Sequence, residues 1–218
     1  MSTARKMIIE TAKKYMGVTQ YSRLHKHIID VYNTVAPGGY KAHYSDAWCS
    51  EFASFCAIET FGKSIAKKYF PLTASCPRMV ELAKKMGIWK ENDAYIPKTG
   101  DFILYDWSDS GRGDNKNSPD HVGIVKKVTN GYIHVIEGNA GGSKVKQRNL
   151  PVNGRYIRGF VIPEYDKIKI KTKTNTEIAK EVIDGKWGNG TDRKKRLEAA
   201  GYNYYAVQKE VNKILKNK

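Results

Sequence analysis

The sequence predicts an α+β fold for most of the chain and a small bundle of three helices at its C-terminal end. Helical spacing of apolar residues dominates up to Met86, whereas short β-branched and aromatic segments separated by turn residues follow from Gly100. Helical spacing returns after Asn175. Helices first and an antiparallel sheet afterwards are typical of an α+β domain. A chain of 218 residues accommodates one such domain and a small appendage.

The first helices are delimited by residues that commonly begin or end a helix. The initial segment, MSTARKMIIETAKKYM, has helical apolar spacing but no apolar run of signal-peptide length. We therefore expect a protein that is made in a host cytoplasm without a signal peptide. Residues 46–62, DAWCSEFASFCAIETFG, form a predicted helix that Asp46 or Ser45 caps and Gly62 ends. A further helix is predicted over residues 76–86.

Four strands are predicted in the second part of the α+β domain. Their segments are short and rich in β-branched and aromatic side chains: GDFILYDW, HVGIVKKV, YIHVIEGN and YIRGFVIP. The domain is expected to end near Pro163. Residues 164–174, EYDKIKIKTKT, are interpreted as a linker, although the alternation of Ile168 and Ile170 equally fits an edge strand.

Residues 175–218 contain three helical patterns separated by glycine-rich turns. Each pattern has an apolar stripe: Ile178, Val182 and Ile183 in the first, Leu197 and Ala200 in the second, and Val207, Val211, Ile214 and Leu215 in the third. Three short helices make a bundle near the lower size limit for independent folding.

The chain is strongly basic. Its 38 Lys and Arg residues against 22 Asp and Glu residues give a formal net charge of +16. Such a chain is attracted to polyanions, whether nucleic acid, anionic lipid or an anionic cell wall. No helix-turn-helix, zinc-finger or RNA-binding signature is present, so we expect no nucleic-acid partner. No segment has transmembrane length, so we expect no membrane insertion.

The three cysteines show neither the even number of a disulfide framework nor a zinc-site spacing. Cys49 lies in the first turn of its predicted helix, where exposed backbone N–H groups and the helix dipole favour an anion. Its thiol is therefore expected to ionise near neutral pH and to act as a nucleophile. Cys56 and Cys76 are interpreted as structural.

A base for this thiol is expected on a predicted hairpin. His121 opens one strand, and Glu137 and Asn139, two residues apart, lie on one face of the next. A three-residue loop at 129–131 would place His121 on that face, opposite Asn139, whereas a two-residue turn at 130–131 would turn it away. We predict the three-residue loop.

On one face, these residues suit a cysteine acyl-transfer mechanism. His121 can accept the thiol proton and return it to the leaving amine, while Glu137 or Asn139 holds the other ring nitrogen. The backbone N–H of Cys49 is a candidate oxyanion donor. We expect no cofactor. The remaining histidines are interpreted as ordinary surface or core residues: His25, His27, His43 and His134.

Three motifs in chain order, WCSEFASFC, PDHVGIV and VIEGN, resemble the CHAP family of cysteine peptidoglycan hydrolases. The resemblance spans residues 1–163 and implies a papain-like α+β fold. It also implies that Cys49 is the nucleophile, His121 the base, Glu137 the orienting acid and Asn139 a helper. Members of the family cut either the amide between N-acetylmuramic acid and L-alanine or a peptide bond in the stem or cross-bridge.

Some members of this family bind calcium before the nucleophile helix, but the segment GGYKAHYSDAW lacks the clustered carboxylates of such a loop. A different acidic loop, DWSDSGRGDNKNSPD, is interpreted as a solvated loop lining the cleft, so we expect no metal. Its carboxylates are Asp106, Asp109, Asp114 and Asp120. Trp107, in the same loop, is a candidate cleft wall for sugar or peptide, and otherwise packs internally.

The C-terminal segment resembles a short cell-wall-binding repeat of some phage lysozymes, which implies binding of muramyl-peptide units. The candidate binding residues surround a glycine-rich turn: Lys186, Trp187, Gly188, Asn189 and Arg193. Trp187 fits the core of a small bundle equally well. A single copy implies weak binding unless the protein oligomerises, and the oligomeric state stays open.

These interpretations combine into a phage or prophage endolysin with a CHAP catalytic domain at 1–163, a linker at 164–174 and a wall-binding domain at 175–218. The expected partner is bacterial peptidoglycan in an anionic wall, reached through a holin pore or from outside. An amidase is preferred to an endopeptidase. Three alternatives stay open: an autolysin or secreted toxin with the same chemistry, a cysteine peptidase acting on proteins, and a non-catalytic basic binding protein.

Overall fold

The computed structural model describes residues 2–111, 115–169 and 173–216. The chain divides into two compact units, Met1–Ile168 and Lys169–Lys218, and each is described by itself. Asp114, one of the carboxylates of the acidic loop, lies outside the described residues.

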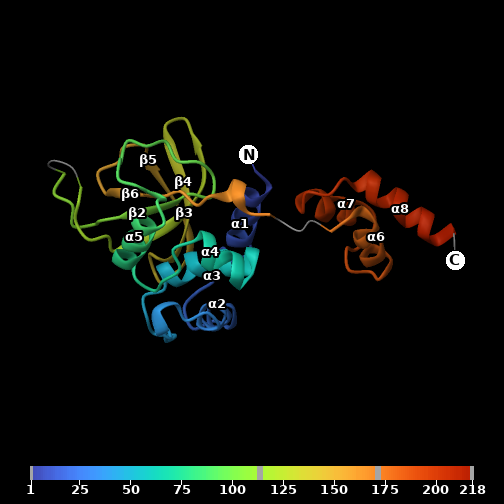
Figure 1. Cartoon of the computed structure of the whole chain (residues 1–218), viewed down its shortest axis with the longest axis horizontal. Helices are drawn as coiled ribbons and strands as arrows, with labels where there is room; N and C mark the ends of the chain where they lie inside the picture. The colour runs from blue at the N-terminus through green and yellow to red at the C-terminus, as the bar shows by residue number, and fades with distance from the viewer. Residues whose placement is uncertain (1, 112–114, 170–172, 217–218) are drawn as a thin grey trace. The chain divides into compact units, whose positions relative to one another are not determined.

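The larger unit is built on an antiparallel sheet in which the described strands follow the order β1-β6-β2-β3-β4-β5 (Figure 1). The strands are β1 (Trp89–Lys90), β2 (Phe102–Tyr105), β3 (His121–Thr129), β4 (Tyr132–Ala140), β5 (Lys144–Pro151) and β6 (Ile157–Val161). The four predicted strands are present as β2, β3, β4 and β6. Sequence analysis missed β1, which has two residues, and β5, whose side chains are mostly polar and half-buried or exposed.

Helices precede the sheet in the chain, which confirms the α+β prediction. They are α1 (Thr3–Lys14), α2 (Arg23–Asn33), α3 (Cys49–Phe61), α4 (Lys63–Tyr69) and α5 (Cys76–Lys85), with short 3-10 helices η1 (Pro37–Gly39) and η2 (Tyr165–Lys167). Helix α3 packs on strands β3 and β4, and α2 packs on α3 (Figure 1). No helix in the described part of the chain is long and apolar enough to cross a membrane.

Helix α3 begins at Cys49 itself. Its N-cap is Trp48, which makes no side-chain cap, so the predicted capping by Asp46 or Ser45 is wrong. The carboxylate of Asp46 instead accepts a hydrogen bond of 2.7 Å from the backbone N–H of His43. The first N–H groups of α3 are therefore without a side-chain cap beside the Cys49 thiol.

A glycine lets α3 approach the sheet closely. A Cβ atom on Gly138 of β4 would lie 2.5 Å from Cβ of Phe52, which no real pair of atoms tolerates. Only glycine fits at this position, and it allows the start of α3 to lie close to β4, the strand that carries Glu137.

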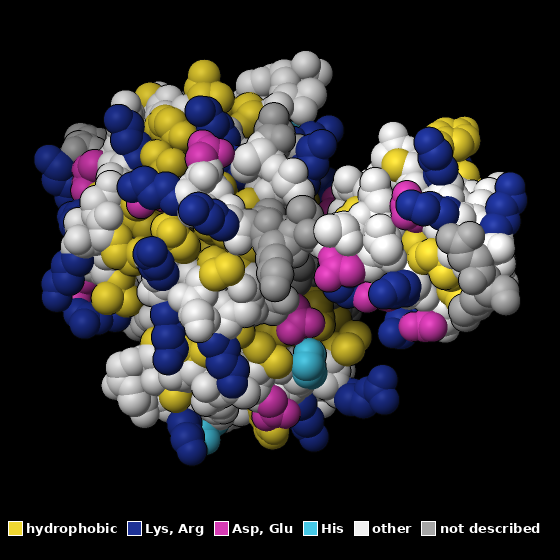
Figure 2. All heavy atoms as spheres, turned by 45° about the vertical axis from the view of Figure 1, so that its right-hand side comes forward, with side chains coloured by type: hydrophobic (Ala, Val, Ile, Leu, Met, Phe, Trp, Pro, Cys, Tyr) yellow, Lys and Arg dark blue, Asp and Glu magenta, His cyan; other side chains and the backbone are white. Residues whose placement is uncertain are grey.

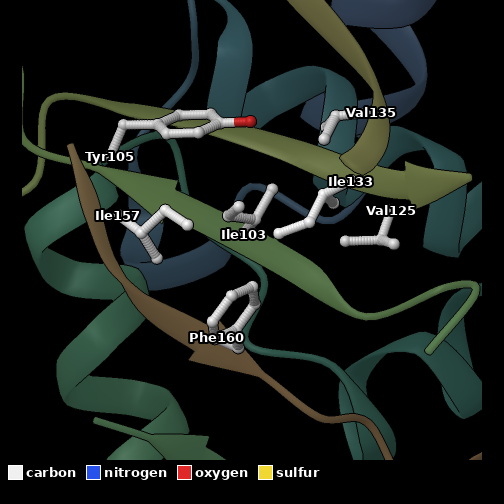
Figure 3. Close-up of a cluster of buried hydrophobic side chains, with 7 residues drawn as sticks. All are labelled: Ile103, Tyr105, Val125, Ile133, Val135, Ile157 and Phe160. Carbon is white, nitrogen blue, oxygen red and sulfur yellow. The ribbon is translucent and has the colours of Figure 1, made fainter. Parts of the chain in front are cut away.

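The core of the sheet is apolar and fully buried. Figure 3 shows side chains from β2, β3, β4 and β6 gathered in one cluster: Ile103, Tyr105, Val125, Ile133, Val135, Ile157 and Phe160. Tyr105 lies at the end of this cluster that continues into the candidate site, where it pairs with His121. The aromatic ring of Tyr105 thus joins the packed core to the face of the sheet that carries His121.

The hairpin between β3 and β4 differs from the prediction. Thr129 pairs with Tyr132, so Asn130 and Gly131 alone form the turn. Both have positive φ, 52° and 76°, which is the geometry of a two-residue type I′ turn and the known preference of an Asn-Gly pair. The predicted three-residue loop is therefore wrong.

A β-bulge restores the face that the site requires. The pairing of β3 with β4 shifts between Val125 and Lys127, so that Ile124 lies opposite Ile136. Because β3 has one extra residue at this point, the side chains of residues 121–125 lie on the opposite face of the sheet from the one that uninterrupted pairing would give. His121 and Glu137 consequently share a face, as predicted, but because of the bulge and not because of the turn.

The larger unit ends later than the predicted domain end at Pro163. Tyr165 is 2% exposed, and its hydroxyl donates a 2.6 Å hydrogen bond to the carbonyl of Gly100. The guanidinium of Arg5 lies 4.6 Å from the centre of the same ring. The first residues of the predicted linker 164–174 therefore belong to the packed unit, where residues 165–167 form a turn of 3-10 helix. The edge-strand alternative also depends on Ile170, which lies outside the described residues.

The smaller unit consists of α6 (Asn175–Ile183), α7 (Gly190–Ala199) and α8 (Tyr204–Lys216). A capping box between Thr174 and Glu177 begins α6. The buried core contains Ile178, Ala179, Val182, Leu197, Val207 and Val211. Ala200 and Leu215, assigned to the apolar stripes, are exposed because each lies at the end of its helix.

Candidate active site

The thiol of Cys49 lies at the start of α3 and is 6% exposed. A hydrogen bond with the Cys76 thiol lowers its pKa well below the usual value. Burial acts in the opposite direction, and the neighbouring His121 imidazole and the backbone N–H of Val122 lower the pKa further. The position therefore favours a thiolate, as the helix terminus alone had predicted.

His121 stands at the first position of β3, with its ring 5.8 Å from the ring of Tyr105. Its Nε2 lies 3.4 Å from Oε2 of Glu137, an ion-pair distance. Burial by itself would lower the pKa of His121, but hydrogen bonding and charge from Cys49 and Glu137 raise it to about 9. The group is thus poised as an imidazolium between a sulfur anion and a carboxylate.

Glu137 is fully buried and is shared between two cations. Its other neighbour is Arg148 of β5, whose Nε lies 2.8 Å from Oε1 and 2.9 Å from Oε2. Arg148 thus holds both oxygens of the buried carboxylate with one N–H group. Sequence analysis missed Arg148, because β5 is a polar edge strand without the alternation that identifies a half-buried strand.

Asn139 occupies a different position from the predicted one. It has a φ of 53°, at a point where the pairing of β4 with β5 shifts between Glu137 and Ala140. Within the described part of the chain, its side chain makes no hydrogen bond to His121. Glu137 is therefore the residue that faces the imidazole, and the bulge gives the reason why a regular strand register misplaced Asn139.

Trp107 lies directly over this group of residues. Its ring stacks 4.8 Å from the ring of Tyr105 and lies 6.0 Å from that of His121. The guanidinium of Arg148 is 4.8 Å from its centre, and the side chain is 40% exposed. Trp107 therefore packs on the site residues and leaves part of its ring exposed, and its role as a wall for sugar or peptide stays a prediction.

The acidic loop that carries Trp107 is not wholly solvated, in contrast to the prediction. Asp106 is fully buried, and its carboxylate accepts hydrogen bonds of 2.9 Å and 2.6 Å from the backbone N–H and hydroxyl of Ser108. Asp109 is 6% exposed. Asp120, which is exposed, lies 3.3 Å from the backbone N–H of Trp107. Asp106 and Asp120 therefore help to shape the loop through hydrogen bonds to its backbone.

Two further groups near Cys49 were not predicted as site residues. The thiol of Cys76, which was predicted to be structural, lies 3.7 Å from the Cys49 sulfur. Glu51, two residues after Cys49, is 1% exposed, and burial raises its pKa to about 9. It is a neutral acid near pH 7. Cys56, in contrast, is buried, as predicted, and burial raises its pKa.

In the smaller unit, the candidate binding residues lie around one turn. The side chain of Arg193 donates hydrogen bonds to the carbonyl of Gly188 (3.0 Å), to Asn189 (3.0 Å) and to Gln208 (3.2 Å). Trp187 is half-buried against the bundle core, with its indole N–H 3.0 Å from Glu181. Lys186 is exposed and lies 3.4 Å from Asp184.

Comparisons with known proteins agree with this division. The CHAP domain model matches residues 39–139, a range that contains the site residues from Cys49 to Asn139, and the CW_7 repeat model matches residues 176–215. A lysozyme of Streptococcus phage Cp-7 is 52% identical over 42 residues, which are 19% of this chain and 12% of that protein. The chain thus spans only a small part of the length of this curated relative. No solved structure matches the chain.

Proposed function

We propose that this chain, in which a CHAP domain precedes a CW_7 repeat, is a phage peptidoglycan hydrolase that attacks an amide bond with the thiolate of Cys49. One observation carries the proposal: within the CHAP range, the Cys49 thiol, the His121 imidazole and the Glu137 carboxylate form a continuous buried series. A thiolate and an imidazolium in contact are the reactants of cysteine acyl transfer.

The reaction proceeds in two halves. The Cys49 thiolate attacks the amide carbonyl, and the uncapped N–H groups at the start of α3 stabilise the oxyanion. Nε2 of His121 faces Glu137, so Nδ1 is the ring nitrogen that can donate a proton to the amine as the amide C–N bond breaks. His121 then removes a proton from water, which hydrolyses the acyl-enzyme and frees Cys49.

Glu137 and Arg148 keep the imidazole oriented. The carboxylate stabilises the imidazolium, and the guanidinium of Arg148 holds both carboxylate oxygens in the buried site through hydrogen bonds. Arg148 also lies against Trp107, whose exposed ring offers a flat apolar surface to a sugar or peptide beside the scissile bond.

Replacing Glu137 with glutamine is expected to change the pH dependence of kcat/KM. The pKa of His121 is about 9 because a carboxylate and a thiolate favour its charged form. The active imidazolium is therefore lost as pH rises through 9, and activity should decline there. Removing the carboxylate charge should move this alkaline limb to lower pH by about one unit.

Glu10→Gln is the matched control for this profile. It removes an exposed carboxylate that pairs with Lys13 on α1, so the alkaline limb should stay in place. A limb that does not move in Glu137→Gln would contradict the assignment of Glu137 as the partner of His121.

The bond that is cut is best tested on purified walls. We favour the amide between N-acetylmuramic acid and L-alanine over a peptide bond, so mass spectrometry should find free stems with a new N-terminal alanine. A new amine at any other position would mean an endopeptidase. New reducing sugar ends without any new amine would contradict amide hydrolysis altogether.

The CW_7 repeat is proposed to hold the enzyme on muramyl-peptide units of an anionic wall. Its turn carries the exposed Lys186 beside the half-buried Trp187, and the basic surface of the chain supports the attraction (Figure 2). Arg193 shapes this turn through its hydrogen bonds to Gly188 and Asn189. One repeat on one chain predicts weak, avidity-dependent binding.

A further inference from the structure

The mechanism above leaves one buried thiol beside the nucleophile without a role. Cys76 is the first residue of α5, as Cys49 is of α3, so both sulfurs lie at helix N-termini. They are 27 positions apart in the chain, yet their sulfur atoms are 3.7 Å apart. Both side chains are almost fully buried, at 5% and 6% exposure.

The surroundings of Cys76 are polar as well as apolar. The hydroxyl of Ser50, the residue after the nucleophile, lies 3.1 Å from the Cys76 sulfur. Ser50 and Cys76 therefore form a short chain of hydrogen-bonding groups that ends at Cys49. Cys56 offers a contrast within the same helix, because its sulfur has no such neighbour in the described part of the chain.

The charges decide which sulfur keeps its proton. His121 supplies a positive charge at Cys49, and two adjacent thiols cannot both ionise without mutual repulsion. Hydrogen bonding to Cys49 and burial raise the pKa of Cys76, while the pKa of Cys49 is lowered. Cys76 is consequently a thiol that donates its proton toward a thiolate.

We propose that Cys49 and Cys76 form a reversible thiol pair: Cys76 donates a hydrogen bond to the Cys49 thiolate when reduced, and a peroxide closes the two into a disulfide that blocks the nucleophile. The inference rests on the positions of the sulfurs and only in part on the proposed function. It makes Cys76 a positioning residue for the reduced enzyme and a resolving residue for the oxidised one.

The oxidation step balances with hydrogen peroxide as the oxidant. The Cys49 thiolate attacks one peroxide oxygen and the O–O bond breaks, which gives a sulfenic acid; the leaving hydroxide takes a proton from the His121 imidazolium and becomes water. The Cys76 sulfur then attacks the sulfenic sulfur, the S–S bond forms, and the oxygen leaves as a second water. Two thiols lose two electrons in total. The sulfurs must close from 3.7 Å to a bond of about 2.0 Å, which modest side-chain rotation supplies.

The test uses the full chain, reduced and then treated with hydrogen peroxide, without any wall substrate. After denaturing alkylation, mass spectrometry should find the Cys49 and Cys76 peptides joined and two hydrogen atoms lighter, with Cys56 still alkylated. Dithiothreitol should restore both free thiols. Overoxidation of Cys49 to a sulfinic acid in the wild-type chain, with no joined peptide, would overturn the proposal.

Variants separate the two roles. Cys76→Ser should lose the disulfide and collect the sulfinic acid at Cys49, whereas the control Cys56→Ser should behave like the wild-type chain. In Cys76→Ala, alkylation of Cys49 by iodoacetamide should require a pH about one unit higher, with Cys76→Ser in between because its hydroxyl can still donate. An unchanged alkylation profile in Cys76→Ala would refute the positioning role.

These readouts do not depend on hydrolysis. A chain that forms the disulfide but does not degrade walls would refute the proposed function and leave the thiol pair standing. A chain that degrades walls but forms no Cys49–Cys76 disulfide would refute the thiol pair and support the proposed function.

Discussion

Cys49→Ala is expected to abolish wall lysis, with a loss in rate on the order of 10³-fold or more. The thiolate supplies the electron pair that attacks the carbonyl, and the methyl group of alanine has none to offer. Because the residues around Cys49 belong to two helices and a strand that pack independently of the sulfur, the domain should stay folded. The decrease in turbidity of purified walls measures the rate, and circular dichroism checks the fold.

Cys56→Ala is the matched control for this loss. Cys56 lies in the same helix and is fully buried, but it is not part of the series formed by Cys49, His121 and Glu137. Its substitution leaves a small cavity and costs about 1 kcal/mol of unfolding free energy, while lysis should continue. A Cys49→Ala chain that clears walls at the wild-type rate would end the proposed mechanism.

The second large effect is expected from removing the smaller unit. Deletion of residues 169–218 should weaken binding to whole walls by about 10- to 100-fold, because one of two linked attachments is lost. The larger unit keeps its own core, including the buried Tyr165, so turnover of soluble muramyl peptides should change little. Co-sedimentation with walls measures binding, and product release from soluble fragments measures turnover.

Salt distinguishes the two origins of this binding. Attraction between a basic protein and an anionic wall weakens steeply as ionic strength rises, whereas a shaped binding site keeps part of its affinity. The difference between the full chain and the deletion should therefore persist at high salt. Equal binding of both chains would refute the role assigned to the CW_7 repeat.

The sequence alone was enough to predict those features of the fold that are determined by residues close together in the chain. Gly62 ends the helix that starts at Cys49, Ser75 caps the helix that starts at Cys76, and each predicted β-branched segment is long enough to identify a strand. The helix start alone led to the prediction of a reactive thiol at Cys49, and the position of His121 at a strand start led to the prediction of its partner. Short-range geometry determines these positions, so a single sequence was sufficient.

Contacts between strands and between separate helices were determined only by the tertiary structure. The two-residue turn by itself would place His121 and Glu137 on opposite faces of the sheet, and the bulge between Val125 and Lys127 brings them to the same face. Arg148 and Cys76 reach the site from an edge strand and from another helix. A bulge, a cross-strand ion pair and a contact between helix ends arise from packing of distant segments, and no local pattern in the sequence encodes them.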